Sequence, residues 1–214
     1  MNTTDIDEHQ TDLQTLQFYE NYASKVAQRA LGENVDSAHE KFTARLPDNA
    51  RILEAGCGPG RDVKYFLKQG YSVDAFDGSS SMCDIAREYT GHNIKNMKLT
   101  EINEEQLYDG VWASASILHL RFSEVIDVFK LIEKAVKPGG VFYSSFKFGD
   151  GERISQKSGR RFTNMNFDSM RSLCDRLDNF KIVEMWLTED NREYRKQDMW
   201  LNTILEKGRS NDQF

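Results

Sequence analysis

The sequence is poor in cysteine and proline and lacks any long hydrophobic run. Its three cysteines, Cys57, Cys83 and Cys174, stand far apart without Cys-x-x-Cys or Cys/His spacing, which argues against a disulfide framework and against a metal site. We expect them to be reduced thiols. No stretch approaches the ~20 apolar residues of a membrane span, and the polar start lacks the apolar core of a secretory signal. These absences predict a cytoplasmic protein with no membrane partner.

Positive charge is also in the minority. The 214 residues hold 28 Lys and Arg against 34 Asp and Glu, for a net charge of −6. An acidic balance is unfavourable for wrapping polyanions, so we expect no nucleic-acid partner. This length suits one domain, present as a monomer or homodimer. We expect a helical arm or lid over 1–35, the main domain over 36–207 and a tail over 208–214.

Short apolar runs alternate with helical patterns from about residue 50, which is typical of an α/β protein with a mostly parallel sheet. An amphipathic helix is predicted ahead of it over 13–31. Ser80 or Ser81 is the expected cap of the helix that follows the second strand. The polar segment 147–165 shows no clear periodicity. The strands are expected at 51–55, 71–76, near 96–100, 110–115, 141–146, 180–187 and 198–206.

The most informative pattern is a glycine-rich segment, 54–61, placed after the first strand and before a helix. Glycines there let the backbone turn and approach a ligand closely. Asp77 ends the second strand, where its carboxylate can accept the hydroxyl hydrogens of a ribose. The pair predicts an adenosine-type ligand. A nicotinamide dinucleotide is the alternative, but its third glycine would fall on Arg61, whose bulk opposes the close packing which that motif requires.

Four ordered segments carry a resemblance to a known family: ILEAGCGPGRD, VDAFDGSSSM, YDGVWASASILHL and FKLIEKAVKPGGVFYSSFK. Together, over about residues 40–207, they resemble class I S-adenosylmethionine (SAM) dependent methyltransferases, including small bacterial ones similar to tellurite-resistance methyltransferases. The resemblance implies SAM as cofactor. It also implies a Rossmann-like three-layer sandwich whose seven-stranded, mostly parallel sheet ends in an antiparallel strand.

Cofactor roles follow from that resemblance by position. Gly56, Cys57 and Gly58 would lie under the methionine part of SAM, and Glu54 would hold the loop. Asp77 would hold the ribose, with a helix cap as its alternative role. Met82 would lie beside the adenine, with plain core packing as its alternative role. Ala113 would face the sulfonium. The full expected cofactor site is Glu54, Gly56, Cys57, Gly58, Arg61, Asp77, Gly78, Ser79, Met82, Glu101, Ile102 and Ala113, with Ser114 beside it.

The acceptor side is less sharply defined. His119, just past the fourth strand, is the candidate general base, although it could equally cap that strand. His39 and His92 are expected on the surface. Tyr19 and Tyr22 lie three apart on one helical face, as a lid over the cofactor or as packing against the sheet.

A basic segment follows the fifth strand and predicts an attraction for an anionic acceptor, unless its charges pair with surface acids. The expected substrate residues are Tyr19, Tyr22, Lys147, Arg153, Arg160 and Arg192. The hypothesis is a methyltransferase that acts on a small, possibly anionic molecule by in-line transfer. A SAM-binding scaffold without transfer activity and a nicotinamide-dependent oxidoreductase are the alternatives.

Overall fold

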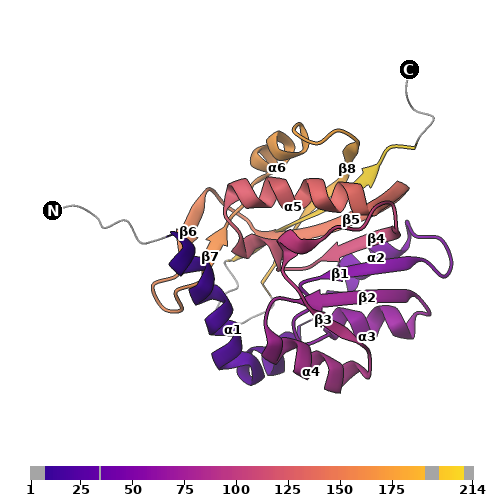
Figure 1. Ribbon diagram of the computed structural model, residues 1–214. Helices are drawn as coiled ribbons and strands as arrows, with labels where there is room; N and C mark the ends of the chain where they lie inside the picture. The colour runs from indigo at the N-terminus through magenta and orange to yellow at the C-terminus, as the bar shows by residue number, and fades with distance from the viewer. Residues whose placement is uncertain (1–7, 34, 191–197, 210–214) are drawn as a thin grey trace.

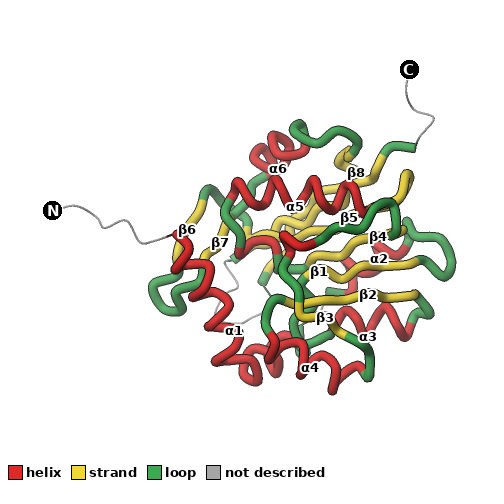
Figure 2. The backbone as a smooth tube through the Cα atoms, in the orientation of Figure 1, coloured by secondary structure: helices red, strands yellow, loops and turns green. Residues whose placement is uncertain are grey.

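The computed structural model describes residues 8–33, 35–190 and 198–209. Seven strands form one sheet in the order β3-β2-β1-β4-β5-β9-β8, and a separate two-stranded sheet pairs β6 with β7 (Figures 1 and 2). The strands are β1 (Arg51–Ala55), β2 (Ser72–Asp77), β3 (Ile94–Asn96), β4 (Tyr108–Ala113), β5 (Val136–Lys147), β6 (Glu152–Ile154), β7 (Arg161–Thr163), β8 (Phe180–Glu189) and β9 (Met199–Lys207).

The helices cover both faces of the large sheet. Their bounds are α1 (Glu8–Ala30), α2 (Asp36–Thr43), α3 (Arg61–Lys68), α4 (Ser80–Thr90), α5 (Phe122–Ala135) and α6 (Phe167–Cys174), with 3₁₀ turns η1 (Leu99–Glu101) and η2 (Ile117–His119). One core cluster joins α5 and α6 to one face, and a second joins α2, α3 and α4 to the other. Figure 1 shows the resulting three layers, with α1 lying beside α4 and the β6–β7 hairpin.

The strand directions confirm the predicted topology. β3, β2, β1, β4 and β5 pair in parallel, and β9, the last strand of the chain, runs antiparallel to both of its neighbours. Parallel strands buried on both faces are mostly apolar, as in β1, where four of the five residues are buried and three of those four are apolar, Glu54 being the exception. Because the central strands are parallel, their carboxyl ends meet at one edge, which positions the site.

Three local predictions differ from the structure. The third strand lies at Ile94–Asn96, before the predicted 96–100, where η1 forms instead. Segment 147–165, predicted without regular structure, contains the β6–β7 hairpin, whose residues Arg161–Thr163 are all buried. The cap of α4 is Ser79, whose hydroxyl accepts the Met82 amide, so the choice of Ser80 or Ser81 was one or two residues late.

His39 was predicted on the surface but is buried on α2, a helix that the sequence pattern did not indicate. Its ring stacks on Tyr65 at a centroid separation of 3.9 Å, and its Nε2 lies 3.2 Å from the Asp62 carboxylate. Aromatic stacking and an acid partner at Nε2 stabilise the buried imidazole, while its buried Nδ1 has no hydrogen-bond partner among the described residues. Polar neighbours in sequence hid both partners, which are more than 20 residues away.

All three cysteines are buried and unpaired. Within the described residues, no helix has the length and apolar character needed to cross a membrane. The same part of the chain contains no group of acidic, histidine and cysteine side chains that could hold a metal ion.

Candidate cofactor and acceptor site

A cavity of about 870 Å³ opens at the carboxyl ends of the central strands. One side is formed by the glycine-rich segment after β1, the end of β2 and the residues around η1. The other side is formed by α1, the turn after β4 and the ends of β5 and β8. Ligands collect at this edge in open α/β sheets, so the cavity is the candidate functional site.

The glycine-rich segment turns sharply beneath the cavity. Gly56 has φ +80°, and a Cβ there would lie 2.5 Å from the Ser116 Cβ, so no other residue fits. Gly58 has φ +53° and open space where a Cβ would point. The amides of Gly56 and Cys57 both donate to the Phe76 carbonyl and tie the turn to β2. Glycine is therefore required by packing at 56, while at 58 it leaves room above the backbone.

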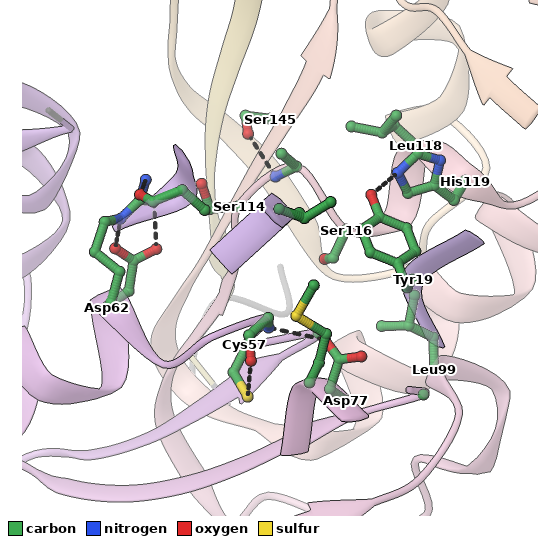
Figure 3. A pocket seen from close by; sticks show the side chains of 18 of the residues that line it. Tyr19, Cys57, Asp62, Asp77, Leu99, Ser114, Ser116, Leu118, His119 and Ser145 are labelled. Atoms are coloured by element: carbon green, nitrogen blue, oxygen red, sulfur yellow. Dashed lines mark hydrogen bonds and ion pairs between the residues drawn. The ribbon is translucent and has the colours of Figure 1, made fainter. Parts of the chain in front are cut away.

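Asp77 connects the turn to the end of β2 (Figure 3). Its Oδ2 accepts the Gly58 amide at 2.8 Å and its Oδ1 accepts the Ser79 amide at 2.9 Å. Burial raises the pKa of the Asp77 carboxyl, although both amide hydrogen bonds oppose that effect. Each oxygen retains a second lone pair, so the carboxylate can still accept hydroxyl hydrogens from a ligand.

Glu54 brings a second acid to the cavity from β1. Burial, reinforced by nearby Asp62, raises the pKa of its carboxyl well above the usual range. No hydrogen bond to the loop is formed, so the expectation that Glu54 holds the loop needs correction. Instead its buried Oε2 has no hydrogen-bond partner. A buried acceptor without a partner is costly, and a cationic donor in the cavity would satisfy it.

Arg61 and Asp62 begin α3 and form a buried ionic network. Arg61 donates to Asp62 through Nε at 2.6 Å and to the Ala30 carbonyl through Nη1 at 3.3 Å. Asp62 also accepts the Trp112 indole hydrogen at 2.8 Å. Burial acts to raise the pKa of Asp62, but the Arg61 charge and the hydrogen bonds from His39 and Arg61 together outweigh it and hold the pKa well below its usual range. Arg61 thus reaches the cavity while connecting α1 to α3.

Four predicted cofactor residues do not line the cavity. Glu101 accepts the Lys98 amide within η1, and Ile102 and Ala113 are packed in the core. Ser79 is buried as the α4 cap. The expectation that Glu101 and Ile102 line the cavity is therefore wrong, because Lys98, Leu99 and Thr100 line it at that point, and Ser114, Ala115 and Ser116 line it after β4 in place of Ala113.

Tyr19 of α1 reaches into the cavity and contacts His119 of η2 (Figure 3). The Tyr19 hydroxyl lies 2.7 Å from His119 Nε2, and His119 Nδ1 lies 2.7 Å from the Arg161 carbonyl oxygen. Burial, opposed by the hydrogen bond to the Arg161 carbonyl and aided by the nearby Arg160 charge, lowers the pKa of His119 to about 4. The imidazole is therefore neutral near pH 7.

Tyr22 lies outside the cavity, with 53% of its surface exposed. The backbone of α1 is non-helical at that residue, with φ −121° and ψ 18°. The three-residue spacing consequently does not place Tyr22 beside Tyr19, and its assignment to the substrate site needs correction.

The basic segment does not present a row of cations to the cavity. Lys147 is buried and pairs with Asp190 at 2.6 Å, with its ammonium 4.0 Å from the Trp200 ring centroid. Arg153 lies over Phe162 and lines a separate cavity of about 220 Å³. Arg160 does reach the main cavity, whereas Arg192 lies outside the described residues. Arg153 therefore does not line the main cavity, and its assignment to the substrate site needs correction.

Sequence reasoning missed several lining residues besides those at η1. Asp190, Trp200 and Asn202 reach the cavity from the ends of β8 and β9. Asn202 accepts the Tyr143 hydroxyl at 2.7 Å and so belongs to a polar wall beyond β5. No local motif marks these residues, but strand alternation in β9 could have indicated that Trp200 and Asn202 face the same side.

Comparisons with known proteins agree with this geometry. Residues 52–140 match the protein-family model described as a methyltransferase domain. A malonyl-(acyl-carrier protein) O-methyltransferase of Salmonella typhimurium is 30% identical over 94 residues, 43% of this chain and 37% of that protein. The alpha N-terminal protein methyltransferase 1 of Drosophila melanogaster is 30% identical over 105 residues, 44% of this chain and 38% of that protein. The chain therefore spans less than two fifths of these curated relatives.

The similarity in fold extends over nearly the whole chain. A solved 1,6-didemethyltoxoflavin-N1-methyltransferase of Burkholderia thailandensis, with bound 1,6-didemethyltoxoflavin and S-adenosylhomocysteine, aligns with a TM-score of 0.80. It is 19% identical, and the alignment covers 97% of this chain and 93% of that one. This likeness includes the elements outside residues 52–140.

Residues 52–140 are similar to the methyltransferase-domain family, and the fold of the chain is that of a solved methyltransferase that carries bound S-adenosylhomocysteine. The sheet topology and the glycine-rich turn with its acid agree with this likeness. The nicotinamide and scaffold alternatives are not favoured. The closer likeness to tellurite-resistance methyltransferases stays a prediction.

Proposed function

We propose that this protein binds SAM and transfers its methyl group to a small-molecule acceptor. Bound SAM supplies a methyl group on a sulfonium, which is already a good leaving group. The protein's task is therefore to hold donor and acceptor in line and to exclude water. Few side chains need to take part in the chemistry.

The observation that carries the proposal is Asp77, a half-buried carboxylate oriented by two backbone amides at the edge of the cavity. We assign it to the ribose hydroxyls. The unpartnered oxygen of Glu54 would accept from the ammonium of the cofactor. Gly56, Cys57 and Gly58 would lie beneath its methionine part.

The adenine would lie between the end of β2 and η1. Gly78 and Met82 line the cavity on one side, and Leu99 and Thr100 line it on the other. Met82 is also 1% exposed, so it serves both the core and the cavity wall. Arg61 supports this side through its bonds to α1 and Asp62.

A small acceptor is favoured by the enclosure of the cavity. α1 lies along one side and contributes Leu16, Phe18 and Tyr19 to the lining. The whole-chain likeness to an enzyme crystallised with a bicyclic heterocycle supports the same size class. The charge of the cavity gives less support to an anionic acceptor, because its lining has seven carboxylates and five basic side chains, with Lys147 already paired.

A by-product assay tests the function. Purified protein with SAM is expected to release S-adenosylhomocysteine when an acceptor is present and to show only background release without one. The acceptors are lumazine, uracil, 4-nitrophenol, thiophenol, benzoate and selenite. SAM binding measured by calorimetry without any release across an extended panel would instead favour a binding protein.

The remaining expectations accompany this proposal. A monomer or homodimer in the cytoplasm, without membrane or nucleic-acid partners, is the arrangement we propose for such an enzyme. We also propose that 1–35, which include α1, act as a lid, that the main domain spans 36–207 and that 208–214 are a tail.

A further inference from the structure

The contacts between α1, η2 and β7 form a hydrogen-bond chain with a single direction. Since the Arg161 carbonyl oxygen can only accept, His119 Nδ1 carries the hydrogen. The neutral ring then has an unprotonated Nε2, which accepts from the Tyr19 hydroxyl at 2.7 Å. Arg160 Nη1, which can only donate, is bonded to the Tyr19 oxygen at 3.1 Å.

Packing holds this chain in place. The Arg160 guanidinium lies 4.1 Å from the Phe18 ring centroid and 5.2 Å from that of Phe162. The Thr15 hydroxyl, one turn before Tyr19 on α1, accepts the Arg161 amide at 3.2 Å. Cation–π contacts and a second tether between α1 and β7 fix the Tyr19 ring beside His119.

The direction determines what Tyr19 can do toward a ligand. Its only hydrogen is donated to His119, so its oxygen can act only as an acceptor toward any other group. Tyr19, His119 and Arg160 all line the main cavity. A molecule that meets the Tyr19 oxygen must therefore offer an N–H or O–H hydrogen.

We propose that Tyr19 is the residue that receives the proton of the methyl acceptor and passes its own proton to His119, and that the acceptor is a neutral compound with a hydroxyl or ring N–H group. This proposal rests on the proposed methyl transfer and names its acceptor class. His119 then acts through Tyr19, and Arg160 positions the Tyr19 oxygen.

The step balances in atoms and charge. The acceptor oxygen or nitrogen forms a bond to the methyl carbon while the carbon–sulfur bond breaks, and that electron pair stays on sulfur. The acceptor proton moves to the Tyr19 oxygen as the Tyr19 proton moves to His119 Nε2. After the product leaves, the proton returns through Tyr19 to water, which restores the neutral imidazole.

A weakly basic imidazole is sufficient for this step. The pKa of His119, lowered to about 4 by burial and by Arg160, keeps the ring neutral and ready to accept at physiological pH. An oxygen or ring nitrogen that gains a methyl group before losing its proton becomes strongly acidic, so proton loss coupled to transfer is favourable even toward a weak base. Thiolates, carboxylates and metalloid oxyanions have no proton to give and gain nothing from the chain.

The first test compares variants with the best acceptor found in the by-product assay. Tyr19→Phe keeps the ring and removes the hydroxyl; it is expected to lower kcat about 100-fold while SAM affinity changes less than 3-fold. His119→Gln should give a similar loss, and the double variant should lose no more than either alone. Tyr89→Phe, an exposed tyrosine on α4, is the matched control and should keep its activity.

The second test needs no turnover. Nitrogen-15 NMR of His119 in the full chain with S-adenosylhomocysteine should show a neutral ring with its hydrogen on Nδ1 from pH 6 to 8. Tyr19→Phe should shift the Nε2 resonance, whereas Tyr89→Phe should not. A hydrogen on Nε2 would overturn the relay even if no acceptor were turned over.

The outcomes separate the two proposals. Failure to release S-adenosylhomocysteine with any acceptor, alongside the expected His119 spectrum, counts against methyl transfer and leaves the hydrogen-bond direction intact. Turnover by Tyr19→Phe at the wild-type rate, or a best acceptor among thiophenol, benzoate and selenite, overturns the relay but leaves the methyltransferase in place.

Discussion

The two sides of the cavity are built in different ways. On the cofactor side, Gly58 and Asp77 lie 19 residues apart and are joined by adjacent parallel strands. On the acceptor side, Tyr19 and His119 lie 100 residues apart, and Tyr19 and Arg160 lie 141 apart. The first side is one compact βαβ unit, whereas the second is assembled from three distant segments.

This difference shows which side of the cavity can be predicted from the sequence. A turn that requires glycine and an acid at a strand end leave a readable pattern, because backbone geometry restricts both residues. A tyrosine on a helix and an arginine beside a hairpin leave none, because their pairing depends on how α1 docks. Substitutions on either side of the cavity, and at the contact between the two sides, test this difference.

The largest effect is expected on the cofactor side. Asp77→Ala removes the carboxylate that we assign to the ribose and should weaken SAM binding about 100-fold, equivalent to about 2.7 kcal/mol. Calorimetric titration with SAM measures it. Asp74→Ala, on the same strand but paired with Arg51 away from the cavity, is the control. Equal SAM affinity in Asp77→Ala and wild type would contradict the ribose assignment.

A smaller effect concerns stability against pH on the acceptor side. Because the folded pKa of His119 is about 4 and its ordinary value is 6.5, the unfolded chain binds the proton first as pH falls. The free energy of unfolding should thus decline between about pH 6.5 and 4, by about 3 kcal/mol from this residue. The groups that face the ring are the Tyr19 hydroxyl, the Arg160 guanidinium and the Arg161 carbonyl.

Urea unfolding at several pH values provides the measurement. His119→Gln should flatten the decline in the free energy of unfolding. His92→Gln, the same change outside the cavity, leaves His119 in place and should keep the contribution of His119 to that decline. An unchanged slope in His119→Gln would show that this imidazole is not held neutral by the fold.

The smallest effect is expected where the two sides join. Glu20 of α1 accepts the Ser80 amide at 2.6 Å and the Ser81 amide at 3.2 Å, at the start of α4. A carboxylate at a helix N-terminus contributes about 0.3 to 1 kcal/mol, so Glu20→Gln should loosen α1 modestly. We expect a 2- to 5-fold weaker SAM affinity, measured by calorimetry at low and high salt. A change confined to the acceptor KM would show that α1 docks independently of the cofactor side.

Much of the sheet could be predicted from the sequence. The β1 and β2 positions and the helix before the fifth strand were confirmed to within a few residues, because buried parallel strands and amphipathic helices have strong periodic patterns. The antiparallel direction of the last strand, which the family resemblance implied, was also confirmed. The β6–β7 hairpin was missed because its three-residue strands are too short to show alternation. The α2 helix was missed because its sequence is mostly polar and one of its three buried residues is His39.

The cofactor side of the site followed from sequence more closely than the acceptor side. The prediction placed the cavity lining at Glu101 and Ile102, two residues after Leu99 and Thr100, since the chain enters η1 where a longer strand was expected. The anionic acceptor was inferred from a run of basic residues, but a formal charge carries no information about its partner. Lys147 meets Asp190, 43 residues away, and only the pairing of the sheet ends brings them together.

By itself, the sequence determined the class of fold, the glycine turn and the acid that faces it, because each follows from backbone sterics and local hydrophobic pattern. Only the tertiary structure decided which tyrosine enters the cavity, which imidazole nitrogen carries the hydrogen and which basic side chains are already paired. Those properties depend on contacts between segments that are distant in the chain, and such contacts are set by packing.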